Sequence, residues 1–267
     1  MKVLAVVCAR NEEVHIERCL EDLITSGCDV YLIDNDSNDG TRDIASRFLG
    51  NGLIGIRNVE WKGHFSLSQQ LSAKREIIEE SAYDWVIHAD ADEWLVSPVK
   101  GQTLVEAIDE ADSDGYTVIN FHECVFVPLP GEDFFDRDYA EKMCHYYFFQ
   151  PCYPRLNRAW RRDTTLDNSM SGGHVISGRN INISPKDLIL RHYIALNQEH
   201  ARSKYVGRVY SQEDLSLGWH GNRVIINEEN IHLRNHPAIH TVSSPSDHSD
   251  FDLSRPVTKH FWQWENA

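Results

Sequence analysis

The sequence is short of positive charge. Its 26 lysines and arginines face 41 aspartates and glutamates, which gives a formal net charge of −15 and a pI near 5.3. A broad basic surface of the kind that binds nucleic acid or an anionic membrane is therefore not expected. No apolar run is longer than a strand, so no bilayer-spanning helix is expected either.

Paired cysteines are also missing. The six cysteines include no Cys-x-x-Cys pair and mostly fall within apolar segments. A zinc site and a disulfide framework are thus disfavoured, and buried free thiols in a reducing cytosol are expected. A chain of 267 residues can bury one substantial core, and a single domain over residues 1–240 is the expectation.

Residues 1–118 do contain a regular alternation of strand and helix signals. Apolar runs of strand length are followed by segments whose apolar residues recur at helical spacing. This alternation predicts an α/β fold with a mainly parallel sheet flanked by helices. The expected strands lie at 3–8, 30–33, 53–59, 85–87 and 116–121, and the expected helices start after Asn11, near Thr41, after Ser66 and after Thr103.

The stretch Trp85–Trp94 carries the clearest chemical signal. Its apolar start breaks into Asp90, Asp92 and Glu93 where the predicted strand ends. Ligands bind at that edge of open α/β sheets, and two aspartates separated by one residue suit Mg²⁺ or Mn²⁺ bridging a diphosphate. Taken alone, the same pattern fits a solvated acidic turn. The unbroken apolar strand before it favours the metal site.

Two other predicted strands also end in polar loops, Ala9–Glu13 and Asp34–Thr41. An ordinary helix start explains the first loop, and an Asx-rich turn explains the second. Both loops follow strands of the same predicted parallel sheet, however, and the carboxyl ends of such strands meet at one edge. The three polar segments are therefore expected to lie together.

In this order the three motifs resemble the donor-binding half of family 2 glycosyltransferases of GT-A fold, over about the first 120 residues. The resemblance implies a nucleotide-sugar donor, with UDP the expected nucleotide, and a Mn²⁺ or Mg²⁺ cofactor. It implies that Asp90 faces the ribose and that Asp92 binds the metal. The residues that it places around the nucleoside are Ala9, Arg10, Asn11, Glu12, Asp34 and Asp36.

The helix before the acidic strand offers three further candidates for donor contacts, Gln70, Lys74 and Arg75. Ordinary charges on an exposed helix face are the commoner explanation for such residues. The chemistry that the resemblance implies is coherent. A divalent cation neutralises the departing diphosphate, and a base deprotonates the acceptor hydroxyl, from the opposite face of the sugar if the reaction inverts.

Residues 119–240 are irregular and rich in aromatics, and this half is expected to face the acceptor. The aromatic stretch 146–153 reads as core or as a sugar platform. The basic cluster of Arg155, Arg158, Arg161 and Arg162 reads as a solvated face or as a contact to an anionic acceptor or the donor phosphates. Arg202 and Lys204 are surface charges or diphosphate contacts.

A late strand is expected at 188–193, and the resemblance implies that a histidine at its end completes the metal site. His192 fits this position, with His174 the reserve. The resemblance also places the catalytic base on a loop some way earlier, which Asp167 fits, with Glu123 as competitor.

The resulting prediction is a cytosolic, metal-dependent glycosyltransferase, inverting by resemblance, that acts on a glycan or another hydroxyl acceptor. A sugar nucleotidyltransferase is a second enzyme class, but the loop after the first strand lacks its expected glycines. A non-catalytic binder of the same fold is the third possibility. Residues 241–267 read as a linker-like segment and a tail that either folds back or docks a partner.

Overall fold

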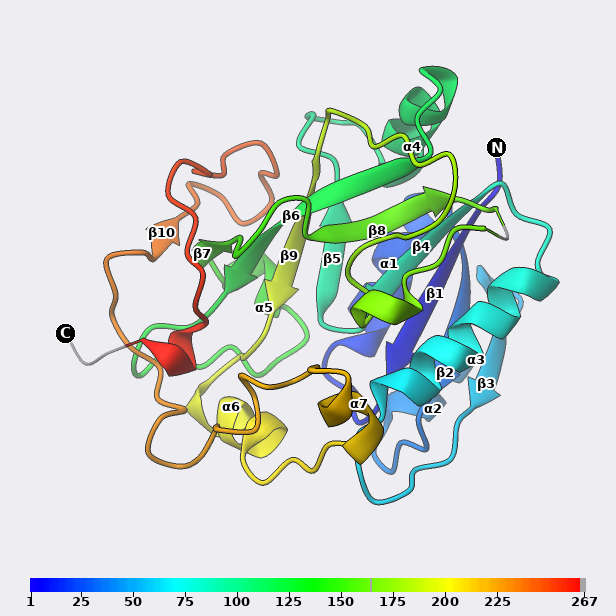
Figure 1. The fold of residues 1–267 in the computed structure, drawn as a ribbon. Coiled ribbons are helices and arrows are strands. Elements are labelled where there is room, and N and C mark those ends of the chain that lie inside the picture. The colour runs from blue at the N-terminus through cyan, green and yellow to red at the C-terminus, as the bar shows by residue number, and fades with distance from the viewer. Residues whose placement is uncertain (164, 265–267) are drawn as a thin grey trace.

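The computed structural model describes residues 1–163 and 165–264, and its first half is a parallel sheet (Figure 1). The strands run β3 (Leu53–Asn58), β2 (Asp29–Asp34), β1 (Val3–Ala9), β4 (Trp85–Asp90), with parallel pairing throughout. The predicted α/β fold with a parallel sheet is confirmed for this half. β1 is central and fully buried, as its unbroken apolar sequence requires.

Helices cover both faces of these four strands. Alternate side chains of β1, such as Val3 and Val7, pack with α1 (Ile16–Thr25), α2 (Thr41–Ser46) and α4 (Leu104–Ser113). The intervening ones, such as Leu4 and Val6, pack against α3 (Leu67–Glu80) on the other face. Two of the predicted N-caps are present, since the side chains of Ser66 and Thr103 accept from the backbone N–H three residues on.

The second half extends the sheet with antiparallel strands. Beyond β4 come β8 (Leu156–Arg161), β6 (Val118–Phe126), β7 (His145–Phe149) and β10 (His240–Thr241), each antiparallel to its neighbour. β9 (Leu188–Tyr193) pairs parallel with β6 and antiparallel with β5 (Glu93–Val96). The helices of this half are α5 (Tyr139–Lys142), α6 (Gln198–Tyr205) and α7 (Gln212–Ser216).

The prediction that Asn11 caps the first helix is wrong. Asn11 has a left-handed backbone with φ of 55°, and α1 starts only at Ile16. Its backbone N–H donates to Ser37 Oγ, and its side-chain oxygen accepts from the Asn38 N–H. Asn11 therefore joins the loops after β1 and β2 instead of starting a helix.

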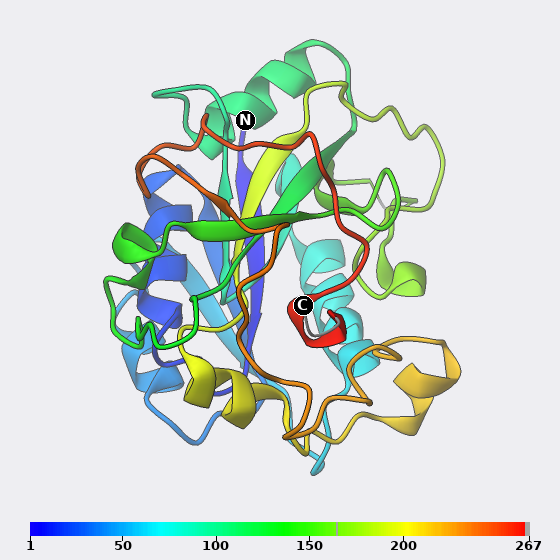
Figure 2. The ribbon, with the colours of Figure 1, turned by 90° about the vertical axis from the view of Figure 1, so that its left-hand side faces the viewer.

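The C-terminal segment folds back on the core. Val257 bridges to Phe149, and a 3-10 turn at Phe261–Gln263 follows. Phe261, Trp262 and Trp264 are buried among residues of β6, β7 and α6. Figure 2 shows this red segment crossing the face of the second half. Of the two alternatives for the tail, residues 251–264 therefore show folding back, because their aromatics complete a hydrophobic cluster. Within residues 1–163 and 165–264, no helix is long and apolar enough to cross a membrane.

Candidate active site

The three predicted motifs meet at one edge of the sheet because the strands that precede them are in parallel register. Ala9 at the end of β1 lies beside Asp34 of β2, and Cys8 lies beside Asp90 of β4. After Asp90 the chain turns directly into β5, where Glu93 pairs with His192 of β9. The sheet itself therefore brings the acidic motif to the late histidine.

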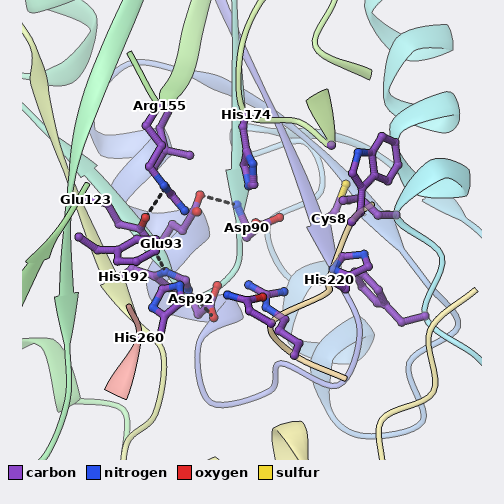
Figure 3. A pocket seen from close by; sticks show the side chains of 18 of the residues that line it. Cys8, Asp90, Asp92, Glu93, Glu123, Arg155, His174, His192, His220 and His260 are labelled. Carbon is purple, nitrogen blue, oxygen red and sulfur yellow. Dashed lines mark hydrogen bonds and ion pairs between the residues drawn. The ribbon is translucent and has the colours of Figure 1, made fainter. Parts of the chain in front are cut away.

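A cavity of about 660 Å³ opens at this edge (Figure 3). Its walls come from both halves of the chain and include residues of the turn 171–175, the segment 218–223, and Thr258, His260 and Gln263 near the C-terminus. The residues singled out from the sequence that line it are Ala9, Arg10, Glu12, Gln70, Asp90, Asp92, Glu93, Glu123, Arg155, Arg158, His174, His192 and Lys204.

Asp92 lies at the centre of a buried chain of charges. Its Oδ2 is 2.7 Å from Lys204 Nζ on α6 and 3.3 Å from His192 Nε2. Lys204 also reaches Glu12 Oε1 at 3.3 Å, which ties the loop after β1 to the acidic motif. Although burial opposes ionisation, Lys204 and His192 hold the pKa of Asp92 well below its usual range.

Glu123 lies behind His192. Its Oε1 is 2.7 Å from His192 Nδ1, and its other oxygen accepts from the Arg155 guanidinium. Burial opposes ionisation of Glu123, but Arg155 and His192 outweigh it and hold its pKa far below the ordinary value. Both oxygens are engaged and the side chain is 4% exposed, so Glu123 is not placed to act as the predicted base.

Asp90 faces the cavity more openly, with 44% of its side chain exposed. Its Oδ2 is 3.5 Å from Arg158 Nη2, and Arg158 also pairs with the buried Glu93. Burial raises the pKa of Glu93 to about 7 even though Arg158 opposes that shift. Beneath them His88 Nε2 is 3.6 Å from Asp90 Oδ1, and His88 Nδ1 is 2.6 Å from Lys74 Nζ.

The loop after β1 forms another wall of the cavity, beside the acidic motif. The Arg10 guanidinium donates to the carbonyls of Asn35 and Asp36 and lies 3.8 Å from the Trp61 ring centroid. Gln70 is buried and donates to Asn35 Oδ1 at 3.4 Å. The two polar loops are thus fixed to each other before any ligand arrives.

Five predicted site residues lie outside the cavity lining: Asn11, Asp34, Asp36, Arg75 and Asp167. Asp34 is buried and accepts from the Ser37 N–H, as an Asx turn does. Arg75 is exposed and pairs with Glu79 and Asp167. Asp167 lines a separate small depression beside α3, so the structure does not support it as the base. Lys74 is also outside the cavity, beneath His88.

Sequence reasoning missed two arginines of the cavity. Arg208 stacks on Phe65 at 4.2 Å, and Arg223 follows the turn Gly218–Asn222. Neither forms an ion pair with any residue in 1–163 or 165–264. Their segment gave no motif, although two unpaired cations in an acidic chain are the residues that a phosphate-bearing ligand requires.

The chemistry of Asp92 and His192 fits a divalent cation. A histidine whose Nδ1 bonds a carboxylate presents its Nε2 to a metal, and Glu123 supplies that carboxylate. His192 Nε2 and Asp92 Oδ2 are 3.3 Å apart, which would let both atoms bind one ion. Although burial opposes it, Asp92 and Glu123 raise the pKa of His192 to about 10, so the ion would have to displace the His192 proton and the Lys204 ammonium that contacts Asp92 Oδ2. No group of three or more His, Cys, Asp or Glu side chains within the described ranges is placed to hold a metal alone, so ligand oxygens or water would complete the shell.

Comparison with known proteins identifies the first half. Residues 4–125 match the model of the family described as Glycosyl transferase family 2. This match confirms the resemblance carried by the three motifs, and the predicted enzyme class is that of the matched family. No curated protein matches the chain in sequence.

Among solved structures, S. aureus TarS is 15% identical, with a TM-score of 0.43 over 86% of this chain and 45% of TarS. A second TarS structure, of residues 1–349 in complex with UDP, gives 15% identity and a TM-score of 0.42 over 76% of this chain and 64% of that one. The chain therefore spans less than two thirds of these relatives. Glucosyl-3-phosphoglycerate synthase from Mycobacterium tuberculosis, in complex with Mn²⁺, UDP and glucosyl-3-phosphoglycerate, is 18% identical with a TM-score of 0.33 over 46% of this chain and 44% of that one.

Proposed function

We propose that the protein transfers a sugar from a nucleoside diphosphate donor, with UDP the expected nucleotide, to a hydroxyl of a glycan or other acceptor. The convergence of the family 2 motifs on a cavity with the Asp92–His192 pair at its base supports the proposal. We place the enzyme in the cytosol because its six cysteines are all unpaired and mostly buried. Inversion at the anomeric carbon follows from the family resemblance.

Different residues of the cavity would bind different parts of the donor. Arg10, held over Trp61, and the loop after β1 would position the nucleoside. Asp92 and His192 would hold Mn²⁺ or Mg²⁺, which when bound supplies positive charge to the departing diphosphate. Arg208 and Arg223 add donors for phosphate oxygens from the opposite wall. Asp90, the most open carboxylate of the motif, would accept from the ribose hydroxyls.

Ligand-induced thermal stabilisation tests the donor site. UDP together with Mn²⁺ should raise the melting temperature, and UDP alone should do so less, because Asp92 would hold the ion that neutralises the diphosphate. Replacing Asp92 by Ala should remove the Mn²⁺-dependent part of the shift and abolish turnover. Equal shifts with and without Mn²⁺ in the wild type would contradict the metal assignment.

Turnover tests the enzyme itself. A panel of sugar nucleotides, assayed for release of UDP or the corresponding nucleotide with and without Mn²⁺, should show hydrolysis of one donor above the rest. Binding of UDP without release from any donor would instead support a non-catalytic protein of the same fold.

A further inference from the structure

The backbone of the turn that carries His174 is held by several hydrogen bonds. The His174 carbonyl accepts from the Asn157 N–H of β8 at 2.7 Å, and its N–H donates to Ser171 Oγ at 3.1 Å. The preceding carbonyl, of Gly173, accepts from Asn168 and from Arg158. Gly173 has a φ of 83°, and a Cβ there would lie 2.6 Å from His88 Cε1. The backbone of His174 is therefore fixed against the strands that carry the acidic motif.

The ring of His174 is left free by this arrangement. It lines the cavity, and Figure 3 shows it pointing inward from the side opposite to Asp92 and His192. Neither ring nitrogen has a hydrogen-bond or ion-pair partner among residues 1–163 and 165–264. A fixed backbone with an unengaged imidazole in a ligand cavity is the arrangement expected of a group that acts on the ligand.

The other proton acceptors of the cavity are engaged elsewhere. The carboxylates of Glu12, Asp92, Glu93 and Glu123 each pair with a buried cation or histidine. Asp90 lies on the donor side beside Arg158. Among the histidines, His88 bonds Lys74, His192 bonds Glu123, His220 faces Asp214 and His260 bonds the Tyr147 hydroxyl.

Resting on the proposed function, we propose that His174 is the general base that accepts the proton of the acceptor hydroxyl. The hydroxyl oxygen bonds to the anomeric carbon as the bond from that carbon to the diphosphate oxygen breaks. The electron pair of that bond leaves with the nucleoside diphosphate. The hydroxyl proton passes to an imidazole nitrogen and then to solvent.

The charges that face His174 keep its ring neutral. Desolvation inside the cavity, together with Arg155 and Arg158, lowers the pKa of His174, so near pH 7 the ring has a free lone pair but is a weak base until a ligand offsets these cations. Arg223 acts in the same direction, while Glu123 opposes it. The bound donor brings negative phosphate oxygens into the cavity, which oppose the arginines and make the ring more basic when the reaction occurs.

The test uses the whole chain and the sugar nucleotide that the wild type hydrolyses fastest, with water as the acceptor. His174→Ala and His174→Gln should lower kcat for UDP release by about 10² to 10⁴, the usual contribution of a positioned base. The Kd for UDP with Mn²⁺ should stay within about threefold of the wild-type value, because the residue acts on the acceptor. Added imidazole should restore part of the turnover of His174→Ala, which a merely structural residue would not allow.

His145→Gln is the matched control, since His145 lies on β7 outside the cavity and should leave turnover unchanged. Turnover of His174→Ala within about tenfold of wild type overturns the assignment. Loss of UDP and Mn²⁺ binding by that variant also overturns it, because it would make His174 a donor or metal ligand. A wild type that releases nucleotide from no donor refutes the proposed function and this assignment together, whereas the first two outcomes leave the proposed function standing.

Discussion

Replacing Lys204 by Met should destabilise the protein and make Mn²⁺ more stabilising. Lys204 Nζ lies 2.7 Å from Asp92 and 3.3 Å from Glu12, and all three side chains are less than 20% exposed. At an effective dielectric constant of about 20, the shorter contact alone corresponds to about 6 kcal/mol of Coulomb attraction. The variant no longer pays the desolvation cost of burying the Lys204 ammonium, which offsets part of this lost attraction. Removing one partner of a buried ion pair typically lowers the free energy of unfolding by about 3–5 kcal/mol.

A loss of this size lowers the melting temperature by roughly 10 °C in a domain of this length. Because Asp92 is left without its ammonium, Mn²⁺ should stabilise Lys204→Met more than it stabilises the wild type. Thermal unfolding of both proteins with and without Mn²⁺ measures the two effects.

Lys186→Met provides the comparison for that experiment. Lys186 Nζ is 2.6 Å from Glu110, a contact as short as that of Lys204, but both side chains are largely exposed. Exposed pairs contribute at most about 1 kcal/mol, so this variant should be nearly as stable as the wild type. If Lys204→Met behaved like Lys186→Met, and Mn²⁺ shifted it no more than the wild type, the buried charge chain around Asp92 would not exist in solution.

Two further changes probe the support beneath the acidic motif. Burial lowers the pKa of Lys74 to about 7, so above that pH the unfolded state holds a proton that the folded state has lost. Between pH 7 and pH 9, the free energy of unfolding should therefore rise by about 2 kcal/mol more in the wild type than in Lys74→Met. Urea titrations of both proteins at the two pH values measure this difference, and an equal rise in both would refute the shifted pKa. Gly173→Ala should cost about 1–3 kcal/mol in urea unfolding, because φ is 83° and the added Cβ meets His88, and a neutral effect would mean that the turn does not hold its backbone as described.

The sequence predicted those parts of the site whose position follows from the order of the parallel strands. Apolar runs identify β1, β2 and β4, and parallel pairing then brings their polar ends together whatever follows. Asp92 could be placed at this edge because it follows a buried strand directly. His192 was predicted from the family resemblance, and the pairing of β9 with β5 brings it beside the acidic motif. Asp167 lies outside the cavity because its loop turns back on Ser177 and faces α3, a path that depends on long-range packing and leaves no periodic signal.

Long-range packing also explains why the net charge of the chain did not predict the charge of the cavity. The chain carries a charge of −15, yet the cavity lining contains six lysines and arginines against five carboxylates. Those carboxylates are paired with cations or histidines, whereas Arg208 and Arg223 form no ion pair within residues 1–163 and 165–264. Composition averages over the whole surface, while folding gathers cations from β8, α6 and the segment 206–223 into one place. An anionic ligand would therefore be attracted to the cavity even though the rest of the surface would repel it.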